Sequence, residues 1–164
     1  MLSLPSKGEV VSIPLYPPPV QMDDESAGAF ASRLDAYAPQ DGVNLRCAMM
    51  SRPEALEARY QLAELQAEER RRLHALRASS SEELEPDLFG DGYQSLEFVQ
   101  AMGRWSRGIL ERHLAGVTGI QVGGADVGGD VAAAVDAFEF NGLLEYAASR
   151  IVAAQGLNER QVFC

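Results

Sequence analysis

Residues that could do chemistry are few in this chain and lie far apart. It has two histidines, His74 and His113, and two cysteines, Cys47 and Cys164. Both histidines lie near arginines in segments of helical periodicity, and neither belongs to a His-Glu-x-x-His zinc motif. The cysteines lack the short paired spacing of a zinc site or a disulfide framework. The sequence also has no Gly-x-Ser-x-Gly turn and no cysteine with a plausible nearby base.

Carboxylates are the remaining candidates for acid-base chemistry. The chain has 24 acidic residues, and a catalytic pair of carboxylates needs no local motif, but nothing in the sequence singles out one pair. The glycine-rich segment 116–130 lacks the Gly-Lys-Ser or Gly-Lys-Thr ending of a phosphate-binding loop. We therefore predict a non-catalytic protein without a metal or another cofactor.

The charge balance points to protein partners. The 164 residues carry 14 basic and 24 acidic side chains, a net charge of -10, with the acidic excess spread along the chain. Glutamates precede the basic run Arg70 to Arg72 and cancel most of its electrostatic field, so we do not expect nucleic acid as a partner. We expect no secretory signal and no membrane span, because the start has no basic region leading into an apolar run and no apolar stretch approaches 18 residues.

Hydrophobic periodicity predicts a mainly α fold, a small helical bundle with an extended N-terminal arm or a short β-hairpin. Helices are expected over 27–38, 51–78, 93–114 and 130–155. Asn141-Gly142 could form a hairpin turn, but the helical period after it favours a helix with a break near Gly142, ending at Gly156. Strand and loop cannot be distinguished over 43–50. The expected core consists of Leu62, Leu65, Leu73, Leu96, Val99, Trp105, Leu144 and Ile151.

Two segments are predicted to be loops in a helical domain that spans 23–164. Residues 79–92 combine serines, acids and Gly90-Asp91-Gly92, which indicates a mobile loop. Residues 116–130 hold six glycines, which fits either a flexible connector or a tight hairpin built on Ile120 and Val122.

The N-terminal residues 1–22 are predicted to be an extended arm. Val10, Val11 and Ile13 favour a strand, and Pro14 restricts that strand to an edge. Such an arm could add a strand to a partner protein, and it could equally be a strand of the chain's own fold. The apolar residues near the two ends of the chain are the predicted partner-binding residues: Val11, Ile13, Leu15, Tyr16, Val162 and Phe163.

Three runs near the N-terminus resemble the opening of a known class of proteins. The runs Leu4-Pro5-Ser6-Lys7-Gly8, Val10-Val11-Ser12-Ile13-Pro14-Leu15 and Asp23-Asp24-Glu25 resemble the opening of tail and baseplate assembly proteins of tailed phages. The resemblance implies a structural or chaperone-like assembly factor that works by contacts with other protein subunits. It implies a homo- or hetero-oligomer in the host cytoplasm or in the virion.

Two other functions fit the same composition. An acidic inhibitor or immunity-like protein would cover the active site of a basic enzyme by charge complementarity. A regulatory helical domain would touch nucleic acid with the face that contains Arg70 to Arg72.

Overall fold

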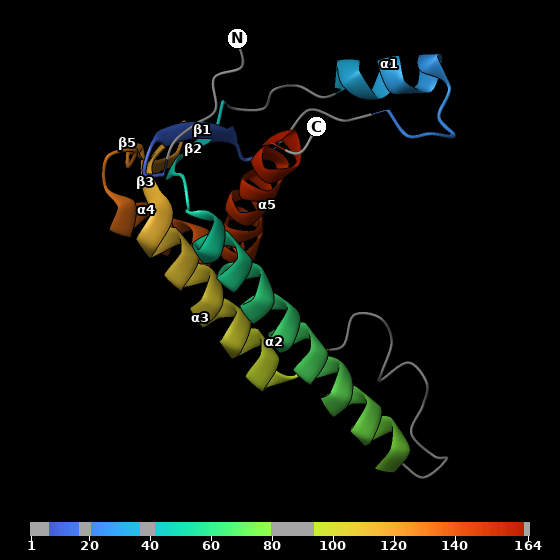
Figure 1. Cartoon of the computed structure of the whole chain (residues 1–164). Coiled ribbons are helices and arrows are strands. Elements are labelled where there is room, and N and C mark those ends of the chain that lie inside the picture. Colours follow the sequence, from blue (N-terminus) through green and yellow to red (C-terminus); the bar gives the residue numbers. More distant parts are fainter. Residues whose placement is uncertain (1–6, 17–20, 37–41, 80–93, 163–164) are drawn as a thin grey trace.

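Two long helices form an antiparallel hairpin that extends from a small sheet (Figure 1). They are α2 (Arg52–Ser79) and α3 (Leu96–His113), and the end of α2 projects past the start of α3. This computed structural model describes residues 7–16, 21–36, 42–79 and 94–162, with only the backbone described for 35–36 and 156–162. The predicted mainly α class is confirmed, with five helices among the described residues.

The sheet consists of three antiparallel strands, β1 (Val10–Pro14), β2 (Asn44–Ala48) and β3 (Leu114–Thr118), in the order β1-β2-β3. It joins a segment near the N-terminus to one that follows α3 directly. The apolar segment 43–50, whose structure the sequence left open, supplies the central strand. A separate two-stranded hairpin, β4 (Gln121–Val122) and β5 (Ala125–Asp126), follows β3.

Two further helices, α4 (Val131–Phe140) and α5 (Leu144–Val162), complete the core. Helix α4 packs on β3, and α5 packs on α3 and on both β1 and β2. Phe138 and Ile151 are almost completely buried where these helices meet the sheet. The core therefore lies between the sheet and the helices α3, α4 and α5.

The predicted break between the last two helices is confirmed. Asn141 follows α4 and α5 begins at Leu144, because Gly142 adopts a positive φ of 70° that an α-helix cannot contain. The predicted stop at Gly156 is wrong, since α5 continues to Val162. Of the two alternatives for the glycine-rich segment, connector or hairpin, the structure forms the hairpin, with Val122 opposite Ala125 and a turn through Gly123 and Gly124, both at positive φ.

Helix α1 (Ala27–Ala36) differs from the other helices in having no extensive packing against any described element. Figure 1 shows it apart from the sheet and from the α2–α3 hairpin. Its side chains described as far as Leu34 are exposed, except for the half-buried Phe30. The sequence predicted this helix but gave no indication that its apolar face would lack a partner.

The expected core is correct at three positions and wrong at two. Trp105, Leu144 and Ile151 are buried, with exposures of 7%, 5% and 0%. In contrast, Leu96 and Val99 are 69% and 44% exposed, because they lie on a face of α3 that no described element covers. Leu62, Leu65 and Leu73 are partly buried on α2. The predicted mobile loop lies almost wholly outside the described residues.

Candidate partner-binding surface

The outer edge of β1 is the first part of this surface. The Leu15 N–H donates to the Val43 carbonyl (3.0 Å), and the Met49 N–H donates to the Glu9 carbonyl (2.9 Å). Hydrogen-bonded pairs alternate along an antiparallel ladder, so the odd-numbered residues of β1 bond to β2 and Ser12 directs its N–H and C=O to the opposite edge. No strand among the described residues pairs with that edge. It is therefore a template for another strand.

Pro14 fits this edge because of the same alternation. It occupies an outward-facing position, where a missing N–H removes no hydrogen bond from the sheet. Its carbonyl oxygen accepts a hydrogen bond from Nη2 of Arg150 on α5 (3.3 Å). Between Val10 and Tyr16, Ser12 is therefore the residue whose backbone N–H is directed to the outer edge and available to a partner strand.

The structure corrects the predicted arm. Ile13 and Leu15 were expected to face a partner, but their side chains are 6% and 2% exposed in the chain's own core. Val11 is half-buried against the same core. The physical reason is that β2 covers one edge of β1 while α5 covers the face that carries Ile13 and Leu15. The strand is thus an integral part of this fold.

The other three predicted partner-binding residues are Tyr16, Val162 and Phe163. Tyr16 is 43% exposed just beyond β1, and its ring stacks on that of Tyr146 with centroids 5.7 Å apart. Val162 is the last residue of α5, and its side chain is not described. Phe163 lies outside the described residues. Of the six, Tyr16 is the one shown on the surface.

An uncharged groove begins where β1 ends. Its volume is about 420 Å³, and none of the described residues that line it is charged. Four segments supply its walls: the ends of β1 and β2, the hairpin, and the turn between α4 and α5. The principal apolar residues that line it are Leu15, Tyr16, Val43, Ile120, Val122, Phe138 and Leu143. We call it the β1 groove.

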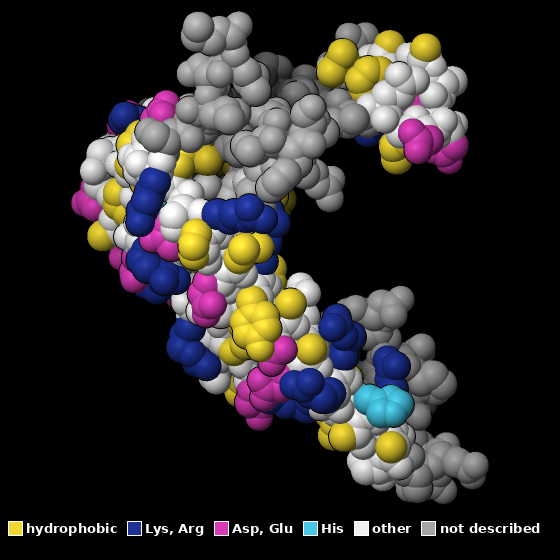
Figure 2. Space-filling view, viewed as in Figure 1, with side chains coloured by type: hydrophobic (Ala, Val, Ile, Leu, Met, Phe, Trp, Pro, Cys, Tyr) yellow, Lys and Arg dark blue, Asp and Glu magenta, His cyan; other side chains and the backbone are white. Residues whose placement is uncertain are grey.

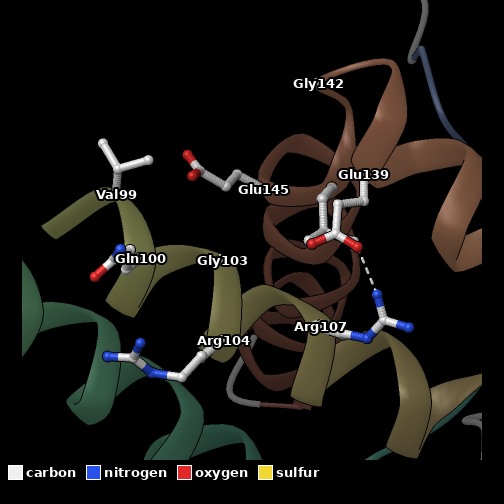
Figure 3. A pocket seen from close by; sticks show the side chains of 9 residues that line it. Val99, Gln100, Gly103, Arg104, Arg107, Glu139, Gly142 and Glu145 are labelled. Carbon is white, nitrogen blue, oxygen red and sulfur yellow. Dashed lines mark hydrogen bonds and ion pairs between the residues drawn. The ribbon is translucent and has the colours of Figure 1, made fainter. Parts of the chain in front are cut away.

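A second groove, the α3 groove, lies between α3 and the turn from α4 to α5 (Figure 3). Its volume is about 620 Å³, and Val99, Gly103 and Arg104 line its α3 side. Figure 3 shows Glu145 extending from the opposite wall toward Val99. Arg104 forms no hydrogen bond or ion pair with the described part of the chain, so one cation in this groove lacks a counterion there.

The neighbouring Arg107, in contrast, forms ion pairs with three carboxylates. Its guanidinium bonds to Glu111 on α3 (2.8 Å) and to Asp136 (2.8 Å) and Glu139 (2.5 Å) on α4. The hydrogen bonds to Asp136 and Glu111 raise the pKa of Arg107 despite partial burial. Arg107 therefore ties α3 to α4 and forms one end of the groove.

Among the described residues, Phe140 is the most exposed large apolar side chain. It is the last residue of α4, it is 90% exposed, and the turn that follows it contributes to both grooves. Sequence reasoning missed it, because its place in an apparently helical apolar run gave no signal of exposure. Leu96 and Val99 were missed for the same reason.

Two of the residues considered first for chemistry, Cys47 and His113, have shifted pKa values. Burial raises the pKa of the Cys47 thiol to about 12, and burial together with Arg112 lowers the pKa of His113. The described residues hold no group of three His, Cys, Asp or Glu side chains suited to a metal ion. Figure 2 shows basic and acidic side chains interspersed on the face drawn.

No helix in the described ranges has the length and apolar character needed to cross a membrane. Comparisons of the chain with protein-family models, with curated proteins and with solved structures found no match.

Proposed function

We propose that this chain is a non-catalytic protein-interaction component of tailed-phage tail or baseplate assembly. The observation that carries the interaction role is the outer edge of β1, which ends at the uncharged β1 groove. In this proposal the partners are other protein subunits, and the protein acts in the host cytoplasm or in the virion.

The edge and the groove suit one mode of recognition. A partner strand can bond to the backbone of Ser12, and main-chain bonds of this kind supply affinity without selecting a sequence. An apolar or aromatic side chain of the same partner can then enter the β1 groove beside Tyr16. Buried aromatic and aliphatic anchors dominate the energy of protein interfaces, so this groove would supply the specificity.

The phage setting is supported by the N-terminal resemblance. Its motif run from Val10 to Leu15 includes β1 (Val10–Pro14), the strand that forms this edge. An assembly factor that presents a strand edge would engage a neighbouring subunit through the segment that resembles those proteins.

Deletion of residues 1–20 would not test the proposal, because it would remove Ile13 and Leu15 from the core. Substitution of Ser12 is a more specific test, because it changes the outer edge of β1 and leaves Ile13 and Leu15 in the core. Ser12→Pro removes the outward N–H and leaves the bonds of β1 to β2 intact, as at Pro14. Ser12→Ala keeps the N–H and serves as the matched control.

The measurement is mass spectrometry of complexes that the tagged full-length protein recovers from the lysate of its source. We expect tail or baseplate proteins with the wild type and with Ser12→Ala, and their loss with Ser12→Pro. Circular dichroism must show that Ser12→Pro remains folded, whereas Val11→Pro, which breaks a bond to β2, should destabilise the fold. Recovery of a single basic enzyme with all three proteins would favour the acidic-inhibitor hypothesis and contradict this proposal.

A further inference from the structure

Helix α1 has features of a docking element. Ser26 Oγ accepts the Ala29 N–H at its start (3.2 Å), and Arg33 bonds Glu25 at 2.6 Å with both Nε and Nη2. These local contacts preorganise the helix, which lowers the conformational cost of binding. Its ten residues are nevertheless too few for a stable isolated helix in water. Phe30 and Leu34 lie one turn apart and would gain a partner by docking.

The α3 groove has the complementary features in the same chain. Val99 and Gly103 line its α3 side, and Leu96 is exposed on the same face of α3 just beyond the groove. A Cβ at Gly103 would meet no described atom within 4 Å, so packing among the described residues does not require this glycine. Glycine within a helix costs about 1 kcal/mol relative to alanine. Close approach of another helix would account for it.

We propose that α1 of one copy docks in the α3 groove of a second copy, and that the reciprocal contact forms a symmetric dimer. The lengths agree: the ten residues of α1 span about 15 Å, and the stretch of α3 that lines the groove, Val99 to Arg107, spans about 14 Å at the helical rise of about 1.5 Å per residue. The occupant is thus a helix of this chain that has no extensive packing in its own copy.

Charge fixes the direction of docking. Asp23 and Asp24 precede α1 and are exposed, and Arg104 lacks a counterion among the described residues. Glu145 extends toward Val99, which precedes Arg104 on α3 (Figure 3). An antiparallel arrangement places the acidic start of α1 on Arg104 and away from Glu145, while Arg33 stays paired with Glu25.

One antiparallel register brings the apolar and small residues of the two helices together to within one residue. It places Leu34 opposite Leu96, Phe30 beside Val99 and Ala27 opposite Gly103. Asp24, which precedes α1, then lies about 3 Å along the axis from the position opposite Arg104, within reach of an arginine side chain. The pairing joins large apolar residues, then small residues, then opposite charges along the groove.

Sedimentation velocity of the purified full-length protein over a wide concentration range tests the dimer. Phe30→Ala with Leu34→Ala is expected to weaken dimerisation about tenfold or more, because both anchors are lost. The matched control is Leu56→Ala with Tyr60→Ala, two apolar side chains of α2 that are 49% and 63% exposed. The control should leave the dimer unchanged. A monomer at every concentration, or equal loss with the control, overturns the proposal.

Charge reversal tests the register. Arg104→Asp and Asp24→Arg should each weaken the dimer, and the double variant should restore it, since rescue requires that the two residues meet. Circular dichroism checks that each variant remains folded. Absence of rescue in folded variants contradicts the register.

A mixing experiment distinguishes exchange between copies from docking within one copy. Gly103→Leu fills the groove but leaves α1 intact, and the Phe30→Ala/Leu34→Ala protein has the opposite defect. Mixing them should produce a heterodimer with one intact contact, whereas docking within a copy would leave both proteins monomeric and overturn the proposal. These tests need no phage protein, so their outcome is independent of the proposed function.

Discussion

The carboxylate of Glu69 on α2 binds both the backbone and the side chain of Ser95, the residue that caps α3. The Ser95 N–H donates to Glu69 Oε1 (2.7 Å), and its hydroxyl donates to Oε2 (2.6 Å). Ser95 Oγ in turn accepts the Phe98 N–H (3.2 Å), and Arg72 contacts both partners. A buried carboxylate thus joins the two helices at the start of α3, where the helix dipole favours a negative charge.

Removal of this carboxylate should loosen the α2–α3 hairpin. Glu69→Ala is expected to lower the free energy of unfolding by about 2 kcal/mol, because the buried Ser95 N–H and hydroxyl lose their charged acceptor. Urea denaturation measures the change. Glu68→Ala is the control, since its side chain is 59% exposed and the substitution should cost less than about 0.5 kcal/mol. Equal effects of both substitutions would show that the Glu69 contacts do not stabilise the hairpin.

Glu54 should titrate at unusually low pH. The Ser51 hydroxyl and N–H both donate to its carboxylate, at 2.6 and 2.7 Å, and lower its pKa to about 2. Because the unfolded pKa is higher, at about 4.3, the carboxylate stabilises the fold above that pH. This contribution is lost as the pH falls from about 4.3 through about 2.

NMR titration of the Glu54 carboxyl carbon measures this pKa directly. Ser51→Ala removes the hydroxyl donor and should raise the pKa toward its ordinary value, while Ser79→Ala at the far end of α2 should leave it unchanged. A wild-type midpoint near the ordinary glutamate value would contradict the capping contact.

The segment after β5 approaches β3 so closely that only glycine fits. The Val117 N–H donates to the Gly128 carbonyl (3.0 Å), and a Cβ on Gly128 would overlap the Val117 carbonyl oxygen. Gly128→Ala should therefore destabilise the fold by about 1–3 kcal/mol. Gly129→Ala is a close control, because a Cβ there would meet nothing within 4 Å. Thermal unfolding compares the two, and similar melting temperatures would disprove the close approach.

Cys47 should be chemically inert in the folded protein. Its side chain is buried in β2, and burial raises the thiol pKa to about 12, so almost no thiolate exists near neutral pH. In a Cys164→Ser variant, iodoacetamide should label Cys47 in urea and leave it unlabelled under native conditions. Rapid native labelling, detected as a mass increase, would show that the sheet opens at Cys47.

Local signals of the sequence determined most of the helical architecture. Ser51 and Glu54 mark the start of α2 because a capping box needs only residues three apart. Gly142 marks the break between α4 and α5 because it can adopt a positive φ. The same local reasoning placed a stop at Gly156, where α5 continues. The signals for starts and breaks were reliable here, whereas a glycine late in a helix did not end it.

Tertiary structure alone decided which of these elements meet. Val10–Pro14 became an edge strand of the chain's own sheet because β2 and α5 bury Ile13 and Leu15. Leu96 and Val99 became surface residues because no described element covers their face of α3, although their periodicity is that of a core stripe. Glu69, which interrupts an apolar stripe in the sequence, is buried because Ser95 lies opposite it. Hydrophobic periodicity identifies a face that can be buried, but contacts between residues distant in sequence decide whether another element covers it.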